Sequence, residues 1–77
     1  MIQYVRPNVG DVITPVMPIG VWEKWGNPNV KPIFEISKDE LAFVIEDLNE
    51  KGGNGIKIFT TDGRTGWVNI CYVKIVQ

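Results

Sequence analysis

The sequence contains a single cysteine, Cys71, and no histidine among its 77 residues. One cysteine cannot form an intramolecular disulfide, and it cannot supply the ligands of a structural zinc site. A domain this small buries only about 60% of its unfolded surface, and it often needs a disulfide, a metal or oligomerisation for stability. Because oligomerisation is the aid that remains, we expect a homo-oligomer.

The same absences argue against catalysis. Without histidine the commonest general base is missing. Cys71 has no basic neighbour in the sequence, so we expect a small buried thiol. The adjacent carboxylates Glu46 and Asp47 would point to opposite faces of a strand, and residues 52–55 lack the lysine of a phosphate-binding loop. We predict that the protein is not an enzyme and has no catalytic residue, metal or cofactor.

Neither sign of charge dominates, because eight basic and nine acidic residues give a net charge of −1 and are scattered along the chain. A protein that follows a phosphate backbone concentrates positive charge on one face, so nucleic acid is the least favoured partner. No apolar run approaches the ~18 residues of a membrane span, and the first residues lack the pattern of a signal peptide. We expect a single cytoplasmic domain over residues 1–77 with no membrane partner.

Segments of β-strand composition flank a long stretch rich in proline, glycine and tryptophan. Residues 12–14 begin a β-branched run, and Pro15 would place that strand at a sheet edge or bend it. Residues 17–36 predict one long, irregular but ordered loop. Such loops often carry the binding residues of a domain.

Residues 37–52 fit two secondary structures. Ser37 and Glu40 have the spacing of a helix capping box. The apolar residues that follow fit a helix at positions 41, 44, 45 and 48, and they fit a strand by alternation at 41, 43 and 45. The residues alone leave both possibilities open.

The segment "IKIFTTDGRTGWV" predicts a β-hairpin. Asp62-Gly63 suits a two-residue type I′ turn, which would place Ile58 opposite Trp67. Alternation along the strands then gives two apolar faces. The predicted outer strip consists of Ile56, Ile58 and Trp67, and either the long loop covers it or it forms a subunit interface.

The C-terminal segment "FTTDGRTGWVNICYVKIV" resembles the second half of SH3-type barrels, in which a hairpin is followed by a 3₁₀ turn and a last strand. The resemblance implies an all-β, SH3-like barrel of about five strands, with a strand at 41–48. It does not extend to the polyproline groove. Ile56 and Asn69 stand where that family has tryptophan and proline, and only Tyr72 matches.

The pairing of "LAFVIE" with "TTDGRTGWV" is also similar to small stand-alone SH3-like proteins of tailed phages. This resemblance implies a phage-encoded binding protein acting in the host cytosol. By analogy, such a protein could sequester a nucleotide signal and so counter host defence. The alternative is an interaction module that blocks or recruits a host or phage protein.

The candidate ligand-binding residues lie mainly in "VWEKWGNPN". Two tryptophans there could stack on a planar ligand, with lysine and asparagine as polar partners, or their rings could plug one end of the barrel. Arg64 could bind a phosphate or carboxylate, or it could lie in a solvated hairpin tip. The predicted ligand-binding residues are Trp22, Lys24, Trp25, Asn27, Arg64 and Tyr72.

Overall fold

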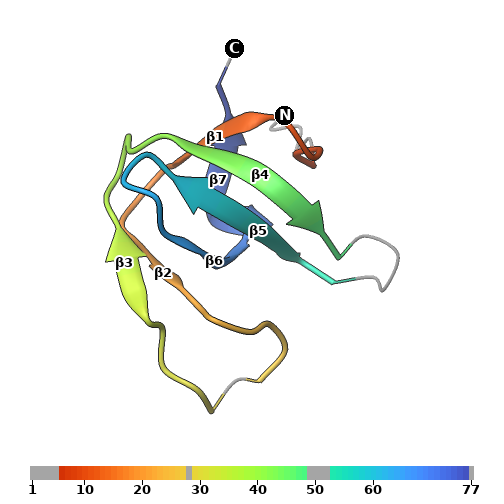
Figure 1. The fold of residues 1–77 in the computed structure, drawn as a ribbon, viewed down its shortest axis with the longest axis vertical. Helices are drawn as coiled ribbons and strands as arrows, with labels where there is room; N and C mark the ends of the chain where they lie inside the picture. Colours follow the sequence, from red (N-terminus) through yellow and green to blue (C-terminus); the bar gives the residue numbers. More distant parts are fainter. Residues whose placement is uncertain (1–5, 28, 49–52, 77) are drawn as a thin grey trace.

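The computed structural model describes residues 6–27, 29–48 and 53–76, and this part of the chain is all-β apart from a short 3₁₀ turn (Figure 1). The prediction of an all-β fold is therefore confirmed. No helix in these ranges is long and apolar enough to cross a membrane. In chain order the elements are β1 (Val12–Pro15), β2 (Ile19–Val21), β3 (Phe34–Ile36), β4 (Ala42–Asp47), β5 (Gly55–Thr60), β6 (Thr65–Asn69), η2 (Ile70–Tyr72) and β7 (Val73–Ile75).

The strands form two antiparallel sheets. The large sheet has the order β6-β5-β4-β1-β7, so the last strand lies beside the first, and β2 and β3 pair separately. An isolated bridge joins the two sheets, in which Trp22 and Trp67 exchange both backbone hydrogen bonds at 2.9 and 2.7 Å. The β2–β3 hairpin is thus attached to an edge of the large sheet.

Two strands lie within the predicted loop at 17–36. Ile19 and Val21 are buried, and they pair across β2–β3 with Ile36 and Phe34. The prediction of a single irregular loop is wrong at both ends, because these apolar residues join the core and draw the backbone into a hairpin. Among the described residues of this stretch, 17–18, 22–27 and 29–33 lie outside the two strands.

Strand β4 settles the choice that the sequence left open. Ala42 and Val44 are buried while Phe43 between them is exposed, as expected for a strand with one face on the core. Ile45 forms a β-bulge, since the pairing with β5 shifts by one residue between Val44 and Glu46. The predicted strand at 41–48 is confirmed.

The β5–β6 hairpin forms with a different register from the predicted one. Its loop has three residues, because the Thr60 N–H donates to the Arg64 carbonyl at 2.8 Å, and only Gly63 has a positive φ, of 87°. A type I′ turn would need positive φ at Asp62 as well. The extra loop residue shifts the pairing by one, so that Ile58 lies opposite Gly66.

This shift moves the predicted outer strip. Ile56 and Ile58 are 0% exposed and belong to the core, whereas Trp67 lies half-buried on the opposite face of the sheet. The assignment of Ile56 and Ile58 to an outer strip is wrong, because the slip in register places buried Val68 opposite Ile56 on the core face and moves Trp67 to the other face, opposite Lys57.

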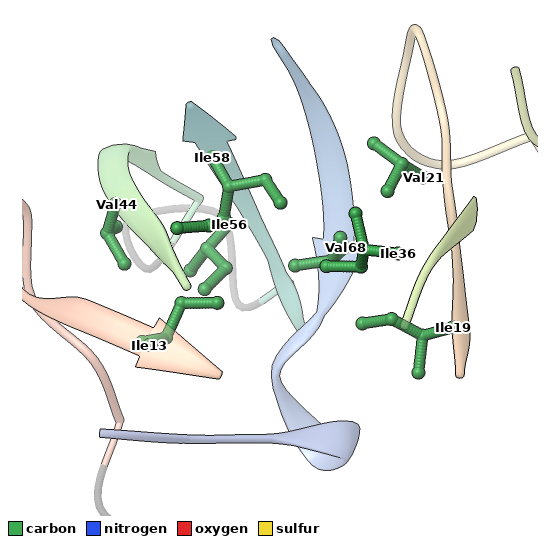
Figure 2. Close-up of a cluster of buried hydrophobic side chains, with 9 residues drawn as sticks. Ile13, Ile19, Val21, Ile36, Val44, Ile56, Ile58 and Val68 are labelled. Carbon is green, nitrogen blue, oxygen red and sulfur yellow. The ribbon is translucent and has the colours of Figure 1, made fainter. Parts of the chain in front are cut away.

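The core lies between the large sheet and the β2–β3 hairpin. Figure 2 shows side chains from β1, β4 and β5 meeting those of β2 and β3, with Val68 of β6 between them. Gly66 allows this close approach, because a Cβ atom there would overlap Val21 Cγ1 and lie 2.9 Å from the Trp22 carbonyl oxygen. The buried apolar residues are Ile13, Ile19, Val21, Ile36, Ala42, Val44, Ile56, Ile58 and Val68.

Candidate functional site

The loop between β2 and β3 carries the candidate site. Figure 1 shows it extending away from the large sheet, beyond the paired part of the hairpin. Its base is fixed by burial of Val21 and by a hydrogen bond of 2.7 Å from the Ile33 N–H to the Val21 carbonyl. The base of the loop, from which its aromatic residues extend, is therefore anchored to the core.

Both the backbone and the indole ring of Trp22 are fixed by hydrogen bonds. Beyond the bridge to Trp67, its Nε1 donates to the Val30 carbonyl across the loop at 2.9 Å. The ring lies against Gly20, where a Cβ atom would come within 3.1 Å of Trp22 Cη2. These contacts fix the orientation of the indole and leave it half-buried.

Trp25 packs on the start of β5. A Cβ atom on Gly55 would lie only 2.7 Å from three atoms of the Trp25 ring, so the indole rests directly on the glycine backbone. Its ring meets that of Trp22 edge to face, with centroids 5.9 Å apart and planes at 84°. This geometry is one that aromatic pairs prefer.

The two indoles form the walls of an open pocket of about 270 Å³. Lys24 and Asn27 supply its polar groups, and both residues are exposed. The Asn27 side-chain oxygen accepts a hydrogen bond of 3.0 Å from the Asn29 N–H, which fixes that side of the loop. We call this feature the tryptophan pocket; it is lined by Trp22, Lys24, Trp25, Gly26 and Asn27.

The structure agrees in part with both predictions for the tryptophans, namely that their rings pack against the barrel and that they line a binding site. Both rings are half-buried, with Trp22 against Gly20 and Trp25 on Gly55, so each contributes to packing. Both rings also line the pocket. Four of the six predicted ligand-binding residues meet there, namely Trp22, Lys24, Trp25 and Asn27.

Arg64 lies elsewhere. Its guanidinium stacks on the Phe34 ring at 4.1 Å and pairs with Asp62 at 2.8 Å. Arg64 does not line the tryptophan pocket, although Phe34 pairs with Val21, the residue before Trp22. Arg64 instead connects the hairpin loop to β3.

The hairpin loop lowers the pKa of one carboxyl group, that of Asp62. The Thr60 hydroxyl donates to the Asp62 carboxylate and the Arg64 guanidinium pairs with it, and these two hydrogen bonds lower the pKa of Asp62. Thr60 Oγ1 also accepts from the Arg64 N–H at 3.0 Å. The charged form of Asp62 is therefore part of the loop's folded geometry.

Tyr72 also lies outside the tryptophan pocket. It ends η2 and is 45% exposed, and its carbonyl accepts from the Val16 N–H at 2.9 Å. Cys71 in the same turn is exposed, so the prediction of a buried thiol is wrong. The reason is local, because η2 contributes no buried residue and Asn69 caps it by accepting from the Cys71 N–H at 2.9 Å. Within the described ranges no three His, Cys, Asp or Glu side chains cluster as metal ligands.

Sequence reasoning missed an apolar surface on the large sheet. Phe43 and Phe59 lie directly opposite each other on β4 and β5, 48% and 42% exposed. Leu41 and Ile45 extend this surface along β4 and are also exposed. The alternation at 41, 43 and 45 was the available signal, and the pairing of β4 with β5 adds Phe59. We call Leu41, Phe43, Ile45 and Phe59 the outer face.

Comparison with protein-family models, with curated proteins and with solved structures finds no match to this chain.

Proposed function

We propose that the protein is a non-enzymatic binding protein that holds a small planar ligand in the tryptophan pocket. The observation that carries the proposal is the pair of perpendicular indoles, 5.9 Å apart, lining one open pocket with Lys24. An indole face binds a planar ring by stacking, worth about 1–3 kcal/mol for a nucleobase. Lys24 adds a positive charge that attracts an anionic substituent.

These features favour a nucleotide-like ligand. The volume of about 270 Å³ suits one ring system with its first substituent, near the lower end of small-molecule sites. An open pocket of this size leaves part of the ligand in water, so we expect binding in the micromolar to millimolar range. The sequence resemblance implies a phage-encoded binding protein, and sequestration of a nucleotide signal is the role that we propose by analogy.

Titration followed by NMR tests this proposal. Addition of mono- and dinucleotides to the labelled protein should shift the indole N–H resonances of Trp22 and Trp25. Trp25→Ala should weaken binding about tenfold or more, as expected for loss of one stacking surface. Tyr72→Ala is the matched control, because this exposed aromatic lies outside the pocket. If no nucleotide at several millimolar moves either indole resonance, the proposal fails.

A protein-interaction role is the second candidate. It is supported by exposed apolar residues around η2, where Val16, Met17 and Tyr72 are each about half exposed and the backbones of Val16 and Tyr72 are hydrogen-bonded. The order of a hairpin, a 3₁₀ turn and a returning last strand is the one expected from a resemblance to SH3-type barrels. Under this candidate, Tyr72→Ala weakens partner binding and Trp25→Ala does not.

A further inference from the structure

The outer face is an apolar feature that the tryptophan pocket leaves unexplained. Its residues lie on or next to β4, the middle strand of the five-stranded sheet, and on β5. Phe43 has Phe59 opposite it on β5 and Val12 opposite it on β1, so the apolar row crosses three strands. Single exposed apolar residues are common on soluble proteins, but a contiguous row of this kind is typical of an interaction surface.

Charged residues surround this row. Half-buried Lys57 and exposed Glu46 form a pair on one side at 4.0 Å, and exposed Lys74 lies on β7 opposite Thr14 of β1, which is buried. An apolar centre with a polar rim is the usual arrangement of a protein interface. The polar residues therefore mark where a bound surface would end.

We propose that the outer face binds the outer face of a second copy of this chain, forming a twofold dimer. A rim that carries both signs of charge is self-complementary, because a twofold contact can place a lysine of one copy near a glutamate of the other. A strongly acidic or basic partner would leave one sign unpaired. The net charge of −1 gives two copies almost no mutual repulsion.

The size of the face sets the expected affinity. The apolar row crosses three strands, which at a spacing of about 4.8 Å are roughly 14 Å wide, and six residues of β4 span about 20 Å. The projected area is thus about 280 Å² per copy, well below the ≈ 800 Å² of a standard interface. Two sheets can stack at such a face with their side chains interdigitated. We expect a weak, reversible dimer with a dissociation constant in the high micromolar range.

Sedimentation velocity over a concentration series tests the dimer. The wild-type chain should change from monomer to dimer between about 1 µM and 1 mM. Phe43→Glu and Phe43→Lys should each raise the dissociation constant at least tenfold, because each places like charges near the twofold axis. Ile33→Glu is the matched control, since Ile33 is 51% exposed but belongs to the β2–β3 hairpin, and it should dimerise like the wild type.

Mixing the two variants tests whether the outer face binds a second copy of this chain or a different partner. An equimolar mixture of Phe43→Glu and Phe43→Lys should dimerise more tightly than either alone, because the opposite charges then face each other. A wild-type chain that stays monomeric to 1 mM overturns the proposal, as does a Phe43→Glu chain that dimerises unchanged. Intermolecular NOEs between Phe43 and Phe59 of labelled and unlabelled wild-type chains provide a check that needs no variant. None of these measurements depends on ligand binding at the tryptophan pocket.

Discussion

At the scale of single residues, two glycines determine where the β2–β3 hairpin meets the large sheet. Gly66 lies beneath Val21 and the Trp22 carbonyl, and Gly55 lies beneath the Trp25 ring. Neither glycine has a positive φ, so the requirement is for space and not for backbone conformation. Nothing in the sequence around Gly55 indicates this, because its partner is thirty residues away in a loop.

Gly66→Ala should therefore destabilise the protein strongly. The added methyl group would overlap Val21 Cγ1 in a fully buried position, and overpacking of a core typically costs about 1–3 kcal/mol. Chemical denaturation gives the change in unfolding free energy. Gly53→Ala is the control, because its nearest neighbour, Leu48 Cβ, would lie at an ordinary 3.4 Å, and it should be close to neutral. Equal effects at the two positions would contradict the proposed contact.

Asp62 should make the stability of the protein depend on pH. Its pKa is lower in the folded state than the ordinary value near 3.8 in the unfolded state. The stabilisation is complete above the unfolded pKa and is lost as the pH falls through the folded pKa. Thermal melts from pH 6 to pH 2 should show this loss, and Asp62→Asn should reduce the slope in that range. A slope that does not change in Asp62→Asn would show that other carboxylates account for it.

At the scale of elements, a local sequence signal predicted the right structure only where the residues that follow it fit the same structure. The Ser37–Glu40 signal is real, since the Glu40 carboxylate accepts from the Ser37 N–H at 3.0 Å, but it closes a single turn. Alternation from Ala42 onward then continues the chain as a strand. The β5–β6 hairpin was predicted at the right place, but its register was not, because Asp62-Gly63 serves a three-residue loop as well as a two-residue one.

An ion pair that sequence reasoning did not find holds the segment before β1 against β4. Arg6 donates from Nε at 3.0 Å and from Nη2 at 2.5 Å to Asp47 Oδ1, and Asp47 raises the pKa of Arg6. The residues are 41 positions apart, and their side chains are 23% and 16% exposed. No local pattern predicts a pair this distant, since it depends on how the strands are arranged.

A double-mutant cycle should measure this pair. With Arg6→Gln and Asp47→Asn, we expect a coupling free energy of about 1–2 kcal/mol, because charge-assisted hydrogen bonds with little solvent exposure are among the stronger ones. The Lys57–Glu46 pair, at 4.0 Å and more exposed, is the comparison and should give less than about 0.5 kcal/mol. Similar values for the two pairs would argue against a role for Arg6 in anchoring this segment.

At the scale of the whole molecule, composition and alternation left the middle strand β4 open between helix and strand, and the all-β fold with a strand at 41–48 was predicted from the resemblance to SH3-type barrels. The tryptophan pocket was found in part, because Trp22, Lys24, Trp25 and Asn27 are close in sequence and share one loop. Arg64 was misplaced and the outer face was missed, since both depend on pairing between strands. Local patterns located the β5–β6 hairpin but not β2 and β3, and the register between strands decides which side chains share a surface.

The pairing of β7 with β1 bears on how the chain folds. Ile13 lies opposite Ile75, a separation of 62 residues along a chain of 77. Ordering so long a loop costs entropy before the contact returns any stabilisation, and domains dominated by such distant pairings fold in milliseconds to seconds. Until β7 arrives, one edge of β1 has no partner, and an open strand edge can pair with another chain. Aggregation during refolding should therefore compete with the addition of the C-terminal strand.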